Sequence, residues 1–542
     1  MNEKILSTME FTKVLHKLAE HAATSMGKQR CMELMPQTDF EKVKILLQAT
    51  DEAVNMDRLN GAAPFGGVRN ITAFIKRAKI GGMLNASELL DVADTIAAGR
   101  KLKFFLQKAD ELDAYPILMK LASKLYDKKM EEEKIHYCID EHGEVKDTAS
   151  SELTKIRHEI KLSENRVRDK LDQMIRSSTV QKMLQDSIAT VRNSRYVIPV
   201  KQEYRSHFGG IIHDQSASGA TLFIEPESVV GLNNKIRELH MREEKEIERI
   251  LLELSGLIAL ISEPILETVW ALGEIDFAFA KAVFARQIQA VRPVLNDRGF
   301  LKLRKARHPL ISKESVVPID IELGNTFTTI IVTGPNTGGK TVSLKTIGLL
   351  SLMSMSGLFV PCEEGSQLCV FDAIYADIGD EQSIEQNLST FSSHMTNIIK
   401  IIKQMTPKSL VLLDELGAGT DPTEGSALAI AILEHMHRMS CRIIATTHYS
   451  ELKAYAFDRK GIINASMEFD VKTLSPTYRL LVGIPGRSNA FAIAERLGLS
   501  VSILQHARGK VHEDDLRVES MIEKLEQNRS QAETEQIAAE QL

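Results

Sequence analysis

The sequence predicts a multidomain α plus α/β fold, in which a helical core and a long antiparallel coiled-coil arm with a small β tip precede a phosphate-binding α/β domain. Three observations support this prediction. A glycine-rich segment, 334–341, separates an apolar β-branched run, 328–333, from a helical run, 342–355. Two long amphipathic runs enclose a β-rich insert at about 187–226. Residues 300–510 alternate strands with helices, which is typical of a nucleotide-binding α/β sheet.

Length and composition narrow the function classes. At ~150 residues per domain, 542 residues suffice for several domains. The net charge of −6 does not indicate nucleic-acid binding by the whole chain, so such binding needs a local basic patch. The sequence has no signal peptide and no apolar run near ~18 residues, which predicts a cytoplasmic protein with no membrane partner. Five scattered cysteines without a C-x-x-C pair argue against zinc and disulfides: Cys31, Cys138, Cys362, Cys369 and Cys441.

Four segments are expected along the chain. Residues 1–149 form the helical core, 150–295 the arm, 296–510 the phosphate-binding domain and 511–542 a charged helical tail. Apolar residues in the arm recur by threes, fours and one seven, with charges between them, which favours a coiled coil. They are Leu153, Ile156, Ile160, Val167, Leu171 and Met174 in the first run, and Leu232, Ile236, Leu239, Ile247, Ile250, Leu254 and Ile261 in the second.

The insert at the end of the arm is the candidate nucleic-acid contact. Short strands are expected around 196–200, 210–212 and 220–224. Basic residues crowd this region and could contact a phosphate backbone. The alternative is a solvated β tip whose charges only keep it soluble, since Glu203 and Asp214 lie among them. The candidate contact residues are Arg192, Arg195, Lys201 and Arg205.

The segment 334–341 has the spacing G-x-x-x-x-G-K-[ST] of a phosphate-binding loop, in the expected context of strand, turn and helix. Glycines let successive backbone N–H groups face phosphate oxygens, and the helix start adds a positive dipole end. Lys340 is expected to reach the β- and γ-phosphates, and the Thr341 hydroxyl to bind Mg²⁺. The candidate ATP-binding residues are Gly334, Pro335, Asn336, Thr337, Gly338, Gly339, Lys340 and Thr341.

Two further strands end in polar residues. The run 409–413 leads into Asp414 and Glu415; Asp414 is expected to hold Mg²⁺ together with Thr341, and Glu415 to orient the attacking water. The alternative is a pair of acidic residues that caps the next helix. The run 442–447 leads into His448, which could hydrogen-bond the water or γ-phosphate or could be merely structural.

These motifs, taken together, resemble the MutS family of ATPases, which implies an ABC-type ATPase domain and the order core, lever, clamp and ATPase over nearly the whole chain. The motifs are GPNTGGKT at 334–341, LSTF at 388–391, DELGAGT at 414–420, ATTHY at 445–449 and RHPL at 307–310. The chain is most similar to the bacterial second-type subgroup, because it starts with the helical core, including TSMGK at 24–28, and carries HDQSASGAT at 213–221. A Phe-x-Glu pattern at 223–225 is a chance match to the mismatch reader.

The resemblance implies residue roles. The phosphates would be bound by Asn336 and residues 338–341, and Mg²⁺ would be bound by Thr341 and Asp414. Glu415 would be the catalytic carboxylate and His448 the sensor. Ser389 resembles the serine that contacts ATP held by a partner subunit, which implies a homodimer. Residues 484–508 resemble the helix-turn-helix that clasps the other ATPase domain.

The resemblance leaves several functions open. The first is an ATP-gated dimeric clamp that binds collided ribosomes through ribosomal RNA. The same clamp could instead bind branched DNA and thereby suppress recombination. A chromosome-organising ATPase is disfavoured by the order of segments. In such proteins the coiled coil lies between the phosphate loop and the Asp-Glu strand, whereas in this chain it precedes both. The LSTF motif and the missing membrane segment disfavour a transporter. The subgroup's C-terminal nuclease-type domain is expected to be missing, so nuclease activity is not carried over.

Overall fold

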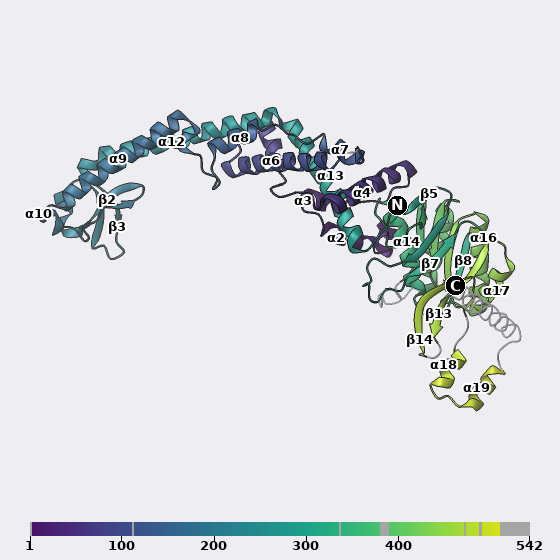
Figure 1. The fold of residues 1–542 in the computed structure, drawn as a ribbon. Helices are drawn as coiled ribbons and strands as arrows, with labels where there is room; N and C mark the ends of the chain where they lie inside the picture. The colour runs from purple at the N-terminus through teal and green to yellow at the C-terminus, as the bar shows by residue number, and fades with distance from the viewer. Residues whose placement is uncertain are drawn as a thin grey trace, which may run out of the picture. The chain divides into compact units, whose positions relative to one another are not determined.

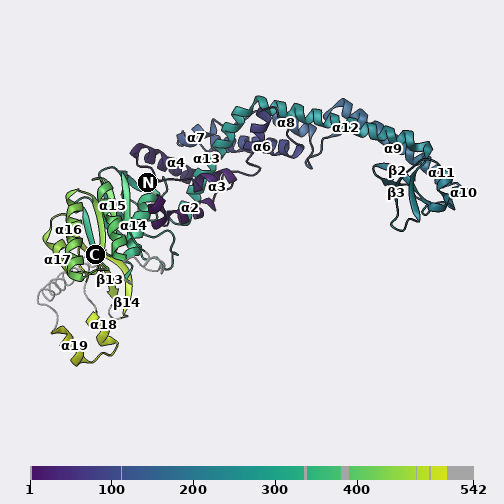
Figure 2. The ribbon, with the colours of Figure 1, turned by 180° about the vertical axis from the view of Figure 1, so that it is seen from behind.

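The computed structural model describes residues 3–110, 113–334, 338–379, 390–470, 473–486 and 490–509. The chain divides into two compact units. The first comprises Met1–Ala63, Leu106–Leu121 and Gly273–Leu542, and the second Pro64–Phe105 and Ala122–Leu272. The mixture of helix and sheet expected from the sequence is confirmed (Figures 1 and 2). The predicted four-segment division stays a prediction.

The first unit contains the predicted α/β region together with N-terminal helices. Its helices are α1 (Glu3–Thr8), α2 (Phe11–Ala19), α3 (Ser25–Met32), α4 (Phe40–Asn60), most of α7 (Pro116–Ala122), the second part of α13 (Ser262–Gln287), α14 (Lys340–Met355), α15 (Thr390–Gln404), α16 (Pro422–Arg438), α17 (Ser450–Asp458), α18 (Ala490–Arg496) and α19 (Val501–Arg508).

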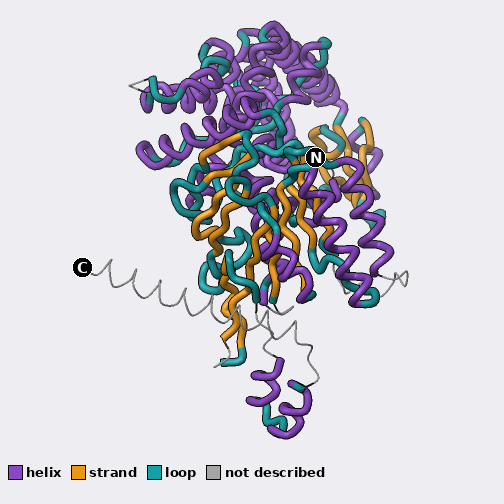
Figure 3. Tube along the Cα trace, turned by 90° about the vertical axis from the view of Figure 1, so that its right-hand side faces the viewer, coloured by secondary structure: helices purple, strands orange, loops and turns teal. Residues whose placement is uncertain are grey.

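A six-stranded sheet forms the centre of this unit, in the order β10-β11-β12-β8-β13-β14. The first five strands of that order are mutually parallel, and β14 pairs antiparallel with β13. Figure 3 shows these strands side by side with helices along them. The strands are β8 (Thr329–Thr333), β10 (Ala373–Asp377), β11 (Ser409–Leu413), β12 (Arg442–Thr447), β13 (Ile462–Asp470) and β14 (Ser475–Val482).

A smaller sheet in the order β5-β9-β6-β7 completes the unit. Its β5 and β9 are parallel, whereas β6 pairs antiparallel with both β7 and β9. These strands bring the chain into the larger sheet, since β7 comes shortly before β8. They are β5 (Val294–Asn296), β6 (Leu301–Ala306), β7 (Ile319–Leu323) and β9 (Gln367–Cys369).

The N-terminal helices supply part of the core beneath the large sheet. Met9 and Phe11 are fully buried in one hydrophobic cluster with Ile330 of β8 and Leu344 of α14. A Cβ added at Gly348 of α14 would lie 2.5 Å from the Met9 sulfur and 2.8 Å from a Leu412 methyl carbon. Glycine at this position therefore lets Met9 fit between α14 and β11.

The second unit holds the helices around the predicted arm. Two long helices, α9 and α12, pack against each other in antiparallel fashion: Ile156 and Ile160 of α9 form a cluster with Leu239 of α12. The helical elements are α5 (Thr72–Lys79), α6 (Ala86–Ala109), α8 (Met130–Cys138), η1 (Asp147–Ala149), α9 (Ser151–Ile175), α10 (Ser178–Gln181), η2 (Gln202–Tyr204), α11 (Arg205–Phe208), α12 (Glu227–Leu260) and the first part of α13.

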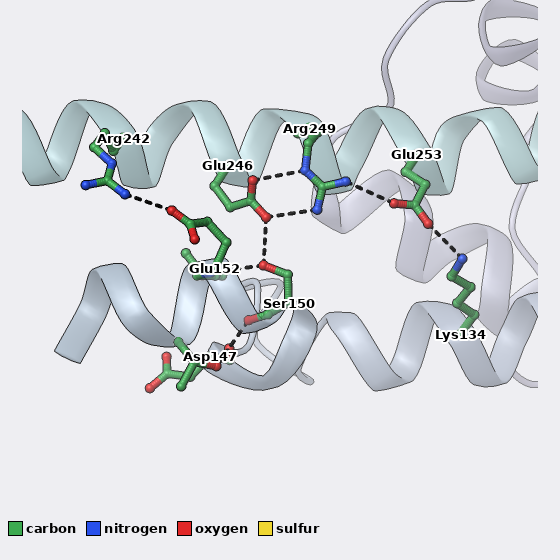
Figure 4. Close-up of polar contacts among 10 residues, drawn as sticks. Lys134, Asp147, Ser150, Glu152, Arg242, Glu246, Arg249 and Glu253 are labelled. Atoms are coloured by element: carbon green, nitrogen blue, oxygen red, sulfur yellow. Dashed lines mark hydrogen bonds and ion pairs between the residues drawn. The ribbon is translucent and has the colours of Figure 1, made fainter. Parts of the chain in front are cut away.

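A polar ladder fixes the register of α9 against α12 near the start of α9 (Figure 4). Ser150 caps α9 by accepting from the Leu153 N–H at 3.0 Å, and its hydroxyl donates to Glu246 at 2.7 Å. Arg242 pairs with Glu152 at 2.7 Å across the two helices. The predicted apolar pattern of these two runs therefore corresponds to an antiparallel helix pair.

A four-stranded sheet in the order β1-β2-β4-β3 forms the β tip, residues 187–226, which lies at the end of the helix pair where α9 finishes and α12 begins (Figures 1 and 2). Its core includes Ile198 and Ile224 of the sheet and Val167 and Leu171 of α9. The strands are β1 (Thr190–Arg192), β2 (Arg195–Lys201), β3 (Ile211–Gln215) and β4 (Thr221–Glu225). Within the described part of the chain, no helix combines the length and apolarity that crossing a membrane requires.

Candidate functional site

The sheet order places the predicted site residues at one edge. Strands β11, β12 and β8 are neighbours and parallel, so Asp414, His448 and Gly334 follow the carboxyl ends of adjacent strands. Ligands of open α/β sheets bind at this edge. Lys340 and Thr341 begin α14, which Gly339 precedes at φ 91°, a conformation that favours glycine.

Lys340 is buried at the mouth of this site. Only 2% of its surface is exposed, and its Nζ donates to the Gly334 carbonyl at 2.8 Å. Burial lowers the pKa of Lys340, while the carboxylates of Glu415 and Asp414 act in the opposite direction. A desolvated ammonium beside two carboxylates is suited to a polyanionic ligand, because the ligand's charge would compensate the burial.

Asp414 lies between two hydroxyl groups. Thr341 Oγ1 donates to one carboxylate oxygen and Thr446 Oγ1 to the other, each at 2.5 Å. The backbone N–H of Asp414 donates to the Asp377 carbonyl at 2.8 Å, which extends the β10–β11 pairing by one residue. The predicted proximity of Thr341 and Asp414 is thus present in the structure.

Glu415 has a left-handed backbone with φ 48°, which is uncommon for a residue with a side chain. Its N–H donates to Thr446 Oγ1 at 2.8 Å, and its carbonyl accepts from the Ala418 N–H at 3.0 Å. The bonds on both sides hold the turn in this conformation. Residues held in such sparsely populated regions cluster at functional sites.

The donor set fits Mg²⁺ and a nucleotide. A carboxylate and a hydroxyl are the hard oxygen ligands that Mg²⁺ takes, usually one or two from protein and the others from phosphates and water. Among the described residues, no group of three or more His, Cys, Asp or Glu side chains could hold a metal ion alone. Thr341 and Asp414 would hold the ion, and Lys340 and the start of α14 the phosphates.

His448 follows β12 with an exposed side chain, beside buried Tyr449 at a ring-centroid distance of 4.4 Å. Tyr449 donates to the Gly417 carbonyl at 2.8 Å, which ties the turn after Glu415 to the turn after β12. His448 therefore lies at the expected edge, and its sensor role stays a prediction. Pro335, Asn336, Thr337 and Ser389 lie outside the described residues, and Gly338 precedes Gly339 at the start of α14.

Four residues that the sequence reasoning did not single out belong to this site's surroundings: Thr446, Asp377, His394 and Asn397. Thr446 bridges Asp414 and Glu415, as described above. Asp377 accepts from His394 Nδ1 at 2.8 Å and from Asn397 Nδ2 at 2.9 Å. The hydrogen bond that His394 donates to Asp377 raises the pKa of His394, burial opposes this shift, and the charges of Asp414 and Glu415 add to it. A polar residue at the end of a fourth parallel strand was the available signal for Asp377.

In the β tip, Arg195 is bound within the protein. Its guanidinium pairs with Glu225 at 2.8 Å and donates to Asn234 at 2.7 Å. Glu225 is fully buried and also contacts His213 Nε2 at 2.6 Å and Asn233 Nδ2 at 2.8 Å. The Phe-x-Glu pattern at 223–225 therefore places its glutamate in an internal network.

The other three predicted contact residues are more accessible. Arg192 stacks on Phe223 at 4.4 Å and lies 3.3 Å from Asp214. Lys201 donates to the Lys182 carbonyl at 3.1 Å, and Arg205 is exposed at the start of α11. The four predicted contact residues do not form a continuous basic surface, because Arg192 and Arg195 are each paired with an acidic side chain.

The region expected to form the helix-turn-helix contains α18 and α19, which contact each other. It presents large apolar side chains to solvent: Leu497 (75% exposed), Leu499 (42%), Val501 (60%) and Ile503 (54%). Arg487 and Ser488 lie outside the described residues.

A parallel sheet with a glycine-rich loop, a buried lysine and a threonine–aspartate pair at its edge defines the class of P-loop nucleotide hydrolases. The family model described as MutS domain V matches residues 330–514 of this chain. The chain is 56% identical over 532 residues to a protein named Endonuclease MutS2 from Brevibacillus brevis, covering 98% of this chain and 68% of that protein. Proteins with the same name from Geobacillus sp. and Halalkalibacterium halodurans are each 55% identical over 97% or more of this chain.

At this identity and coverage, the chain belongs to the MutS family, in its MutS2 branch, and is a MutS-type ATPase. The recognition made from the motifs is confirmed. The chain spans about two thirds of the length of these relatives.

Proposed function

We propose that this chain hydrolyses ATP with Mg²⁺ at the carboxyl ends of β8, β11 and β12, and uses the reaction to open and close a dimeric clamp. The observation that carries the proposal is the Asp414 carboxylate between the hydroxyls of Thr341 and Thr446, next to buried Lys340. Such a site supplies positioning and positive charge, which is what phosphoryl transfer requires.

The chain's own residues would act as follows. Lys340 and the N–H groups at the start of α14 bind and orient the phosphates, while Thr341 and Asp414 supply oxygen ligands for Mg²⁺, which would neutralise phosphate charge. Glu415 orients a water molecule and takes its proton. His448 contacts the water or the γ-phosphate. The backbone of the turn at Glu415 is held from both sides, which fixes the position of its Cα before the substrate arrives.

Dimerisation would complete the site. Ser389 is proposed to contact ATP held by a second copy of the chain. The exposed apolar side chains of α18 and α19 support a partner there, since a few large apolar residues gathered on 490–509 are costly in water. The proposed occupant is the other ATPase domain of the homodimer.

The antiparallel pair α9–α12 is proposed to be the clamp arm, a coiled coil that transmits closure to the β tip. Its interlocked polar ladder and apolar seam support a stiff element. The proposed target is a nucleic-acid assembly in the cytoplasm, namely stalled or collided ribosomes bound through ribosomal RNA. Exposed Arg205 and half-buried Lys201 are the candidates for phosphate contact, whereas Arg195, whose guanidinium pairs with Glu225, is left out of this proposal.

The alternative is that branched or mismatched DNA is the target. The relatives' printed name favours it, because it says endonuclease. A nicking assay on branched DNA with this chain would test that activity separately from ATP hydrolysis.

The deciding experiment uses Glu415→Gln. With ATP this variant should bind nucleotide without turnover and remain closed on its target, so the target should co-purify from cells. Lys340→Ala, which should not hold ATP, is the matched control. Ribosomal RNA enriched over that control supports the ribosome proposal, and enriched DNA supports the alternative. Normal turnover by Glu415→Gln would reject the assignment of the site.

A further inference from the structure

Three side chains form a network on the flank of the nucleotide site. Asp377 is the last residue of the edge strand β10 and is 6% exposed. Its two carboxylate oxygens accept from His394 Nδ1 at 2.8 Å and Asn397 Nδ2 at 2.9 Å. His394 and Asn397 are three residues apart on α15 and therefore share one helix face. Asn397 also donates to the Ala376 carbonyl at 3.0 Å, so α15 is attached to both backbone and side chain of β10.

The same strand end supports Asp414 directly. The Asp377 carbonyl accepts from the Asp414 N–H at 2.8 Å, and Asp377 pairs with Leu413 in the parallel ladder. One residue thus carries α15 on its side chain and the proposed Mg²⁺ ligand on its backbone. A shift of Asp377 would move the Asp414 carboxylate relative to Thr341 and Thr446.

The backbone at Gly379 approaches the partly exposed imidazole from another side. A Cβ added at Gly379 would lie 3.1 Å from His394 Cε1 and 3.4 Å from Nε2. The backbone that leaves β10 therefore passes close to the ring and leaves little space for a different orientation. Lys4 of α1 donates to Asn397 Oδ1 at 3.3 Å and adds a further attachment.

We propose that Asp377 and His394 are positioning residues that couple helix α15 to the Mg²⁺ ligand Asp414. Displacement of α15 would change the geometry of the metal site and hence the rate of hydrolysis. The inference rests on the proposed hydrolysis site and extends it to residues outside the motifs at 334–341, 388–391, 414–420 and 445–449. α15 is the first described helix after the segment that contains Ser389, so events at the dimer contact have a short physical route to Asp414.

Two polar variants of His394 separate this role from a general structural one. Asparagine can place its amide N–H where Nδ1 lies, whereas glutamine places its amide near the Nε2 position. Glutamine is the better helix former, so loss of helix stability would penalise asparagine. If His394 acts by positioning Asp377 through Nδ1, the glutamine variant should be the more impaired of the two. Lys403→Ala, an exposed change in the last turn of the same helix, is the control.

The experiment measures Mn²⁺ binding with ADP by electron paramagnetic resonance and, separately, kcat and KM for ATP. We expect His394→Asn and Lys403→Ala to stay within about twofold of the unmodified protein, while His394→Gln weakens Mn²⁺ binding roughly tenfold and lowers kcat, as residues that orient metal ligands do. KM for ATP should change little. Thermal unfolding of each variant accounts for any unfolded fraction.

Equal Mn²⁺ affinities for His394→Asn and His394→Gln would overturn the inference, as would an effect on KM alone. A protein that hydrolyses ATP normally but shows no difference between these variants contradicts only the positioning role. An unmodified protein with no Mg²⁺-dependent hydrolysis contradicts the proposed function itself, so the two failures are distinguishable.

Discussion

The nucleotide site and the β tip both contain buried charges, but they use them differently. At the nucleotide site, Lys340, Asp414 and Glu415 gather at one sheet edge, and the backbone at Glu415 is held in a left-handed conformation. In the tip, the guanidinium of Arg195 pairs with the buried Glu225 carboxylate, which His213 Nε2 also contacts. Charge that converges on an edge is available for a ligand, whereas charge that closes on itself stabilises the fold. Counting basic residues cannot distinguish these two cases.

The largest expected effect lies at the nucleotide site. Glu415→Gln should lower kcat by roughly 10²–10⁴-fold, the usual contribution of a general base, because the amide cannot accept the proton of water. ATP binding should persist. Steady-state phosphate release and equilibrium binding of a fluorescent ATP analogue measure the two properties. A kcat within threefold of the unmodified protein would contradict the role of Glu415.

In the tip, the comparison predicts a loss of stability. Arg195→Ala should lower the free energy of unfolding by about 3 kcal/mol, because it leaves the fully buried Glu225 without its guanidinium. Arg192→Ala is the matched control, since the exposed pair of Arg192 and Asp214 should contribute less than about 1 kcal/mol. Urea unfolding of the two variants, followed by far-ultraviolet circular dichroism, measures both free energies. Equal losses would contradict the internal role of Arg195.

Acid should affect the first unit through His308. Burial lowers the pKa of His308 to about 4, from 6.5. Between these values the unfolded state binds more protons than the folded one, so stability is fully present above pH 6.5 and is lost as the pH falls toward 4, by up to roughly 3 kcal/mol.

Hydrogen exchange at pH 7 and pH 5, followed by mass spectrometry, would locate the acid effect. The loss of protection should occur in the core around His308 and not in the β tip. His308→Gln should reduce the difference between the two pH values. An unchanged pH dependence in that variant would show that other groups cause it.

The smallest expected effect concerns target binding. Changing Lys201 and Arg205 together to alanine should leave the free energy of unfolding within about 0.5 kcal/mol and reduce the salt dependence of nucleic-acid binding by about one unit of slope per contact removed. A salt titration with ribosomal RNA and with branched DNA measures the slope. No change on either nucleic acid would remove these residues from the interface.

Sequence reasoning reaches furthest where a short spacing of residues is typical of one kind of chemistry. The loop at 334–341, the strand before Asp414 and the strand before His448 all follow from local patterns, and the structure places the described members at one edge. The antiparallel pairing of α9 with α12 was predicted from two long amphipathic runs of similar length that enclose a compact insert.

Long-range partners could not be predicted in this way. Glu225 lies 30 residues from Arg195 along the chain, and the local sequence around either residue does not predict that they pair. The link of Asp377 to His394 and Asp414 depends on strand order, which the spacing of strands leaves open. The packing of Met9 against Gly348 likewise became evident only from the fold.

That packing has a consequence for how the protein is made. The apolar side chains of α2 leave the ribosome early, yet their partners on β8 and α14 are synthesised more than 300 residues later. At about 5–20 residues per second, this delay is on the order of half a minute. During that time Met9 and Phe11 lack the part of their core that β8 and α14 supply, so this region of the nascent chain should depend on chaperones until these elements have emerged. A nascent chain arrested before residue 329 should therefore be more sensitive to proteases near residues 5–18 than one arrested after α14.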